Sequence, residues 1–195
     1  MIDTGTRYQI LPGLLLGFHG TDHATAEKIF AGKSRLIRNE NDYDWLGHGV
    51  YFWEHSPQRA YQFAQEKFRR DKNKEKVAVI GAIIDPGLCF NLLEASALDY
   101  LEIAYETLLD EMGGVEKMPA NGKAFWNRPL DCAVINTVHT MRDSTGQAAY
   151  DLVRGAFWEG GEAYPGARIE KKNHVQLCVR DFGCIKGYFR PIENQ

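Results

Sequence analysis

Apolar positions along the chain group into strands towards both ends, with helical patterns between them. Short apolar runs at 14–19, 49–53 and 76–85 are rich in leucine, β-branched or aromatic residues, which is typical of buried strands. In the last third, YDLVRGAFW, HVQLCVRD and CIKGYFR alternate apolar with polar residues and are separated by glycine and proline. This alternation predicts antiparallel strands there.

Helical spacing with capping signals predicts two helices in the first half of the chain. One helix is expected at 24–31, after Asp22, whose carboxylate is a good N-cap group. The next helix follows Ser56 as its cap and has Pro57 in its first position, where the missing N–H of proline costs nothing. The segment 32–47 lacks both periodicities, so we expect an irregular loop.

Two further helices are predicted in the middle of the chain. One spans 94–112 and stops at Gly113 and Gly114, and the other begins near Asp131. Strands early and late, with helices inserted between them, favour an α+β domain over a doubly wound parallel sheet. The 195 residues are 44% hydrophobic, enough for one sizeable core, so a single domain over 1–195 is expected.

Charge and hydropathy narrow the function classes. The net charge of −3 and pI near 6.1 exclude a uniformly basic nucleic-acid coat, although a local basic patch stays open. The start, MIDTGTRYQI, lacks the basic and apolar regions of a secretory signal, and no apolar run approaches the length of a membrane span. We therefore expect a soluble, cytoplasmic protein with no membrane partner.

Several familiar site signatures are missing from the sequence. The four cysteines form no C-x-x-C pair, so buried free thiols are expected, and the H-x-x-x-H spacing of His19 and His23 lacks a further ligand, so no metal is predicted. There is no nucleophile elbow, P-loop or dinucleotide fingerprint. A cysteine nucleophile acting with His174 stays an alternative, because catalytic partners need only meet in space.

The chemistry-bearing candidates are two strand ends, FHGT and GHGVYF. Each places an imidazole or an aromatic ring beside glycines, which allow a ligand to approach the backbone closely. Together with a later strand, this pattern resembles the ADP-ribosyltransferases of the diphtheria-toxin and poly(ADP-ribose) polymerase type, with their H-G-[ST] strand and G-x-[YF]-F strand that opens onto a helix. The resemblance covers roughly 14–64 and 170–190.

This resemblance implies a fold, a co-substrate and a site. The fold would consist of split antiparallel β-sheets with inserted and flanking helices, and the co-substrate would be NAD. By position, His19 would hydrogen-bond the adenosine ribose, the Gly20 backbone would bind the nicotinamide carboxamide, and Thr21 would support that turn. Tyr51 matches the tyrosine that stacks on nicotinamide, and Tyr61 resembles the second aromatic wall.

The third strand departs from the family pattern. In NHVQLCVR, Gln176 stands where the family often has glutamate. An amide can hydrogen-bond a ribose hydroxyl, but it can neither stabilise a developing positive charge nor remove a proton as a carboxylate does. Another carboxylate is therefore needed, and Glu159 in AFWEGG is the candidate, although an ordinary loop glutamate would look the same.

Basic clusters bear on the acceptor of the ADP-ribose. Residues 66–76 hold six Lys or Arg against three acids, and RIEKKNH at 168–174 leads into the Gln176 strand. These clusters favour RNA or DNA over protein as the acceptor, although a solvated helix end and loop, with its interleaved acids, is the more ordinary explanation of the first cluster. Small bacterial members of the superfamily are often toxins or phage-defence effectors, and by this resemblance an antitoxin partner is expected.

Two other functions stay open. The basic clusters also fit an RNA 2′-phosphotransferase-like enzyme of the same broad fold. The replacement of glutamate by Gln176 also fits a non-catalytic module that binds NAD or ADP-ribose. The expectation retained from the sequence is a mono-ADP-ribosyltransferase, a glycosyltransferase that transfers a pentosyl group.

Overall fold

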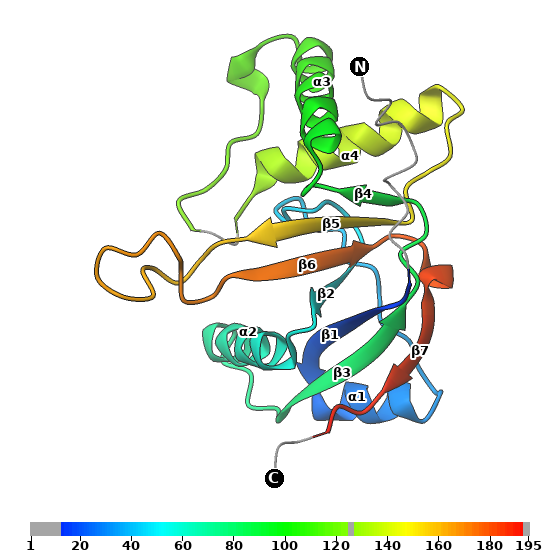
Figure 1. Cartoon of the computed structure of the whole chain (residues 1–195), viewed down its shortest axis with the longest axis vertical. Coiled ribbons are helices and arrows are strands. Elements are labelled where there is room, and N and C mark those ends of the chain that lie inside the picture. The colour runs from blue at the N-terminus through cyan, green and yellow to red at the C-terminus, as the bar shows by residue number, and fades with distance from the viewer. Residues whose placement is uncertain (1–12, 125–126, 193–195) are drawn as a thin grey trace.

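Seven strands form one sheet in the computed structural model, which describes residues 13–124 and 127–192 (Figure 1). Their order across the sheet is β4-β5-β6-β2-β1-β3-β7. Neighbouring strands are antiparallel except β4 and β5, which are parallel. The strands are β1 Leu15–Asp22, β2 Val50–Glu54, β3 Val77–Ile84, β4 Cys89–Asn91, β5 Leu152–Phe157, β6 His174–Val179 and β7 Ile185–Phe189.

The two halves of this sheet meet at a short junction between β1 and β2. These strands pair only at Gly17 with Glu54 and at Phe18 with Trp53, whereas β1 pairs with β3 as far as Asp22. The expected separation into two antiparallel sheets is wrong in that the strands form one hydrogen-bonded sheet and include a parallel pair. Beyond the junction β1 and β2 no longer pair. From His19 onwards, β1 therefore has no partner strand on its β2 side among the described residues.

The predicted strand at 14–19 is longer than expected. Strand β1 continues through His19 to Asp22, because its residues stay in register with Val77–Ile80 of β3. His19 therefore lies within a strand rather than at its end. His23 begins the following helix, so the two histidines of the H-x-x-x-H spacing do not share a helix face.

Four helices accompany the sheet: α1 His23–Phe30, α2 Pro57–Arg70, α3 Ala95–Met112 and α4 Pro129–Ser144. The predicted cap of α1 is confirmed, since the Asp22 side chain accepts a hydrogen bond of 2.7 Å from the Thr25 N–H. Ser56 occupies the N-cap position of α2, but its side chain makes no cap hydrogen bond. Helix α4 begins at Pro129, two residues before the position expected, and Asp131 lies in its first turn.

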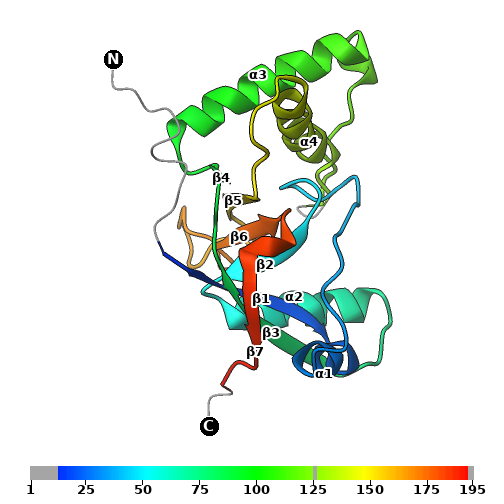
Figure 2. The same ribbon diagram turned by 90° about the vertical axis from the view of Figure 1, so that its right-hand side faces the viewer.

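The helices cover the two halves of the sheet separately (Figures 1 and 2). Helices α1 and α2 pack on the half formed by β1 and β3, and α3 and α4 pack together over the half that contains β4, β5 and β6. Ala104 and Val138, one from each of α3 and α4, are fully buried. This mixed sheet with four helices is consistent with the α+β class.

The described residues contain no helix that is both long and apolar enough to cross a membrane. All four cysteines are buried free thiols. The segment MIDTGTRYQI lies outside the described residues.

Candidate functional site

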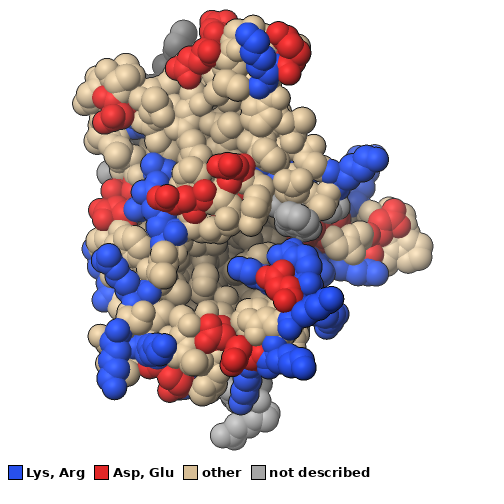
Figure 3. All heavy atoms as spheres, turned by 180° about the vertical axis from the view of Figure 1, so that it is seen from behind, with Lys and Arg blue, Asp and Glu red and all other residues tan. Residues whose placement is uncertain are grey.

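A cavity of about 400 Å³ opens between α2 and the segment that precedes β2. Figure 3 views this side of the molecule and shows a hollow near the middle of the face, with Lys and Arg side chains to its right. Strands β1, β2, β5 and β6 also contribute to the lining. The cavity brings together most of the residues expected from the sequence, namely His19, Gly20, Thr21, Tyr51, Glu159 and Gln176.

His19 connects the diverging strands β1 and β2. Its Nδ1 lies 2.8 Å from the backbone oxygen of Tyr51. Because a carbonyl only accepts, Nδ1 carries the hydrogen and Nε2 of the neutral ring is an acceptor. Burial lowers the pKa of His19, and its hydrogen bond to Tyr51 opposes this effect, while the charge of Lys67 lowers the pKa further. The neutral imidazole is thus suited to accept a hydrogen bond from a ligand hydroxyl.

Gly20 is required by helix packing. A Cβ atom there would overlap the backbone oxygen of Ala60 and the side chain of Ala64. Helix α2 therefore lies against this part of β1 at a distance that only glycine allows. We expected a ligand to approach the Gly20 backbone closely. On this side of Gly20, helix α2 occupies that space instead. The neighbouring Thr21 pairs with Ala78 of β3 and also lines the cavity.

Tyr51 fastens the loop before β2. Its hydroxyl donates to the backbone oxygen of Gly47 at 2.8 Å and accepts from the N–H of Leu46 at 2.9 Å. Burial raises the pKa of this phenol well above its ordinary value, so it stays neutral. Since both hydrogen-bonding roles of the hydroxyl are used, what Tyr51 offers to a ligand is its ring.

Tyr61 does not line the cavity. Its side chain is 41% exposed, whereas Ala60 and Ala64 form the buried side of α2. Successive helical residues point about 100° apart, which turns Tyr61 away from the sheet when Ala60 faces it. The aromatic side chains that do line the cavity near α2 include Trp53 and Phe63, whose ring centroids are 4.7 Å apart.

Gln176 is bonded to a tryptophan that sequence reasoning missed. The indole Nε1 of Trp45 donates to Oε1 of Gln176 at 2.6 Å, and the donor identifies that amide atom as the oxygen. Gln176 is 8% exposed, and its amide nitrogen has no partner among the residues the structure describes. A donor is thus left at the cavity lining. Trp45 falls in the irregular segment 32–47, where no pattern marks it.

Glu159 forms an ion pair with Arg59, the third residue of α2. The side chains of Arg59 and Glu159 are 6% and 18% exposed, so the carboxylate neutralises a buried guanidinium group. Nε and Nη1 of Arg59 are buried without a hydrogen-bond partner in the described part of the chain. Glu159 lies in the cavity lining, as expected, but its charge is committed to a neighbour.

Asp44 is a second carboxylate of the cavity, and no motif pointed to it. Burial raises its pKa to about 6, opposed by a hydrogen bond from Asn41 and by the positive charge of Lys67. Lys67 itself lines the cavity together with Arg70, so the first basic cluster does reach the site. The second cluster, 168–174, contributes no residue to the lining, and its Lys172 pairs with Glu66 at 2.7 Å.

The cysteines are poorly suited to nucleophilic chemistry. Burial raises the pKa of Cys89 and Cys178 to about 12 and that of Cys132 and Cys184 to about 11. Each thiol is therefore protonated at neutral pH. The Nδ1 of His174 lies 2.6 Å from the backbone oxygen of Lys172, and no hydrogen bond joins this imidazole to a thiol in the described part of the chain.

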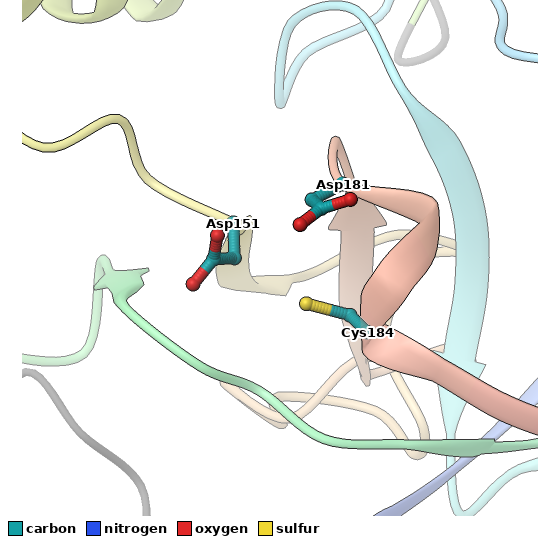
Figure 4. A group of neighbouring side chains, drawn as sticks. All are labelled: Asp151, Asp181 and Cys184. Atoms are coloured by element: carbon teal, nitrogen blue, oxygen red, sulfur yellow. The ribbon is translucent and has the colours of Figure 1, made fainter.

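A group of Asp151, Asp181 and Cys184 lies outside this cavity (Figure 4). One ligand-type atom from each lies within 4.8 Å of the others. Both carboxylates already accept backbone hydrogen bonds, Asp151 from Leu88 at 2.6 Å and Asp181 from Gly183 at 2.8 Å. These bonds and the protonated thiol give the group a structural explanation.

Comparisons with known proteins add one relative. The chain is similar to Uncharacterized protein MJ0359 of Methanocaldococcus jannaschii, with 25% identity over an alignment of 186 residues that covers 87% of this chain and 83% of that protein. No protein-family model matches the chain, and no solved structure gives a significant match. The function therefore has to be argued from the site.

Proposed function

We propose that this protein is an NAD-dependent mono-ADP-ribosyltransferase that binds NAD in the cavity, releases nicotinamide and transfers ADP-ribose to a macromolecule. One observation carries the proposal. His19 and Tyr51 belong to motifs 32 residues apart, yet they line one cavity and are joined by a hydrogen bond. The ADP-ribosyltransferase pattern requires the histidine of one strand and the tyrosine of the neighbouring strand to line one site.

The lining residues fit the demands of the reaction. The bond between ribose and nicotinamide breaks with its electron pair passing to the ring nitrogen, so neutral nicotinamide leaves while positive charge develops on the ribose. The rings of Tyr51, Trp53 and Phe157 provide apolar walls for the nicotinamide. Nε2 of His19 accepts from one ribose hydroxyl, and the amide nitrogen of Gln176 donates to another.

Charge in the cavity suits the remainder of NAD. Lys67 and Arg70 from α2 provide positive charge for the diphosphate. They also favour a polyanionic acceptor, RNA or DNA, over protein. Glu159 contributes by neutralising Arg59 beside the site, so we assign it no proton transfer. In this proposal the protein acts in the cytoplasm as a toxin or phage-defence effector that an antitoxin protein restrains.

The test is the release of nicotinamide from NAD labelled in its adenylate half. The protein is incubated with NAD alone, with RNA, with single- and double-stranded DNA, and with a nucleic-acid-free protein extract. Nicotinamide is quantified by chromatography, and digestion with nuclease or protease then identifies the labelled polymer. We expect release together with label on nucleic acid. Binding of NAD without any release would support the non-catalytic binding module. The absence of both binding and release would overturn the proposal.

A second candidate function is that of an RNA 2′-phosphotransferase-like enzyme. Lys67 and Arg70 in the lining favour it, because the site of such an enzyme must hold both NAD and an RNA phosphate. An RNA carrying one internal 2′-phosphate distinguishes the two functions. Loss of that phosphate in the presence of NAD indicates the phosphotransferase, and stable label on unphosphorylated RNA indicates the transferase.

A further inference from the structure

Among the described residues, four acidic side chains line the cavity, and three of them already bond or pair with a neighbour: Asp22, Asp71 and Glu159. Asp22 caps helix α1 through Thr25. Asp71 pairs with Arg70 at 3.3 Å, and Glu159 pairs with buried Arg59.

The fourth acidic residue is Asp44. Within the described part of the chain, its carboxylate accepts a single hydrogen bond, of 3.3 Å from the Asn41 amide, and no Lys, Arg or His there lies within ion-pair distance of it. Among the acidic residues of the described lining, Asp44 is therefore the one whose negative charge neither a cation nor a helix end compensates.

The chain around Asp44 is held in place at both sides. The backbone oxygen of Asp44 accepts a 2.8 Å hydrogen bond from Gly47, and the Tyr51 hydroxyl bonds Gly47 in turn. The next residue, Trp45, donates to Gln176. Asp44 is thus the residue before Trp45, the hydrogen-bond partner of Gln176. Gln176 is the amide at the position where a carboxylate was expected. Such support from neighbouring bonds keeps a catalytic group in a fixed geometry.

We propose that Asp44 is a catalytic residue, the general base of the transfer, which rests on the function proposed above. Its carboxylate takes the proton from the hydroxyl or amine of the acceptor. The acceptor oxygen or nitrogen forms a bond to the ribose carbon as the bond to nicotinamide breaks. The proton then passes from Asp44 to solvent after the product leaves. In the absence of an acceptor, water takes its place and NAD is hydrolysed.

The surroundings of Asp44 suit a base that acts near neutral pH. Titratable groups face it from four elements, namely Lys67 on α2, Tyr51 on β2, Cys132 on α4 and Cys178 on β6. Raised pKa values keep the phenol and both thiols uncharged, so Lys67 is the charged group among these four. A carboxyl group with a pKa of about 6 is largely ionised at pH 7 and is still a stronger base than an ordinary aspartate.

The test compares Asp44→Asn with Asp42→Asn, a matched control two residues away that is exposed and absent from the cavity lining. We expect Asp44→Asn to lower kcat by about 100-fold or more while the Kd for NAD, measured by calorimetry, changes less than about threefold. Asp42→Asn should match the wild type in both. Full activity of Asp44→Asn overturns this inference and leaves the proposed function standing.

The pH profile of the wild type gives a measurement that does not depend on a folded variant. The base must be ionised to act, so kcat should increase with pH around pH 6 and should decline towards zero at lower pH. A rate that is flat between pH 5 and 8 overturns the role of Asp44. Failure of the wild type to release nicotinamide with any acceptor overturns the proposed function, and this inference with it.

Discussion

The Nδ1–H group of His19 donates to the backbone oxygen of Tyr51 across the gap where β1 and β2 have ceased to pair. This bond sets the tautomer of the imidazole and leaves Nε2 as its acceptor. It also holds the side chain of one motif against the strand of the other. The geometry of the proposed NAD site therefore depends on a contact between a side chain and the backbone.

Substitution of His19 should weaken the proposed reaction strongly. His19→Ala removes the acceptor for the ribose hydroxyl and the bond to Tyr51, so we expect kcat/KM for NAD to fall by about 10- to 100-fold. The control is His23→Ala, which removes an exposed imidazole outside the cavity lining. Nicotinamide release measured at several NAD concentrations checks this. Equal kcat/KM in both variants would remove His19 from the site.

The hydroxyl of Tyr51 should matter for stability. Tyr51→Phe leaves the N–H of Leu46 and the backbone oxygen of Gly47 without their partner, which costs about 1–3 kcal/mol. Tyr61→Phe is the matched control, because Tyr61 is 41% exposed and lies outside the cavity lining. Urea unfolding measures both, and Tyr61→Phe should leave the free energy of unfolding unchanged. Equal stability of the two variants would show that the loop before β2 is held by other contacts.

Removal of the Glu159 carboxylate should destabilise the fold because it leaves the guanidinium of Arg59 buried without a counter-charge. We expect Glu159→Ala to lose about 3–5 kcal/mol, whereas Glu102→Ala, at an exposed position of α3, should cost almost nothing. Adding Arg59→Met to Glu159→Ala should recover part of the loss. Thermal or urea unfolding checks all three, and a cost for Glu159→Ala as small as the control's would contradict a buried pair.

Acid should destabilise the protein through His139 on α4. Burial, followed by the charges of Arg180, Arg38 and Arg142, lowers the pKa of His139 to about 3 from 6.5. Below pH 6.5 the unfolded chain takes up a proton that the folded protein does not, so stability is complete above that pH and falls by about 1.4 kcal/mol per pH unit towards pH 3. The raised pKa of Asp44 acts in the opposite direction, which makes a variant comparison necessary.

The comparison is between the wild type and His139→Gln, which has no imidazole to titrate. Between pH 7.5 and pH 5 the wild type should lose about 2 kcal/mol more than the variant. Urea unfolding at both pH values measures this difference. The contribution of Asp44 is common to both proteins and cancels. Parallel pH dependences would mean that His139 is protonated in the folded state.

Local signals in the sequence were enough to predict most of the secondary structure. Asp22 caps α1, Pro57 opens α2 and Gly113 ends α3 in a left-handed conformation with φ of 72°, because each acts on backbone groups within one turn. The strand of three residues Cys89–Asn91 was not predicted. So short a run carries no periodicity, and its pairing with β5 joins segments 63 residues apart.

The candidate site likewise has residues that local sequence signals predicted and residues whose roles depend on the folded structure. The two motifs identified His19 and Tyr51, since residue type and adjacent glycines mark them within a few positions. The prediction that Tyr61 forms an aromatic wall of the site was wrong, because the direction of a helical side chain depends on which face of the helix the sheet buries. Glu159 pairs with Arg59, 100 residues away in the chain, whereas Asp44 bonds only the nearby amide of Asn41 and has no described cation within ion-pair distance.

The amino-acid sequence by itself determined the helices, most strands and the two motifs, because these arise from interactions between residues a few positions apart. The meeting of the motifs in one cavity, the pairing of Glu159 with Arg59 and the uncompensated charge of Asp44 came from the tertiary structure. Burial and charge compensation are properties of an environment that distant segments assemble. No local pattern encodes which carboxylate in that environment stays without a cation.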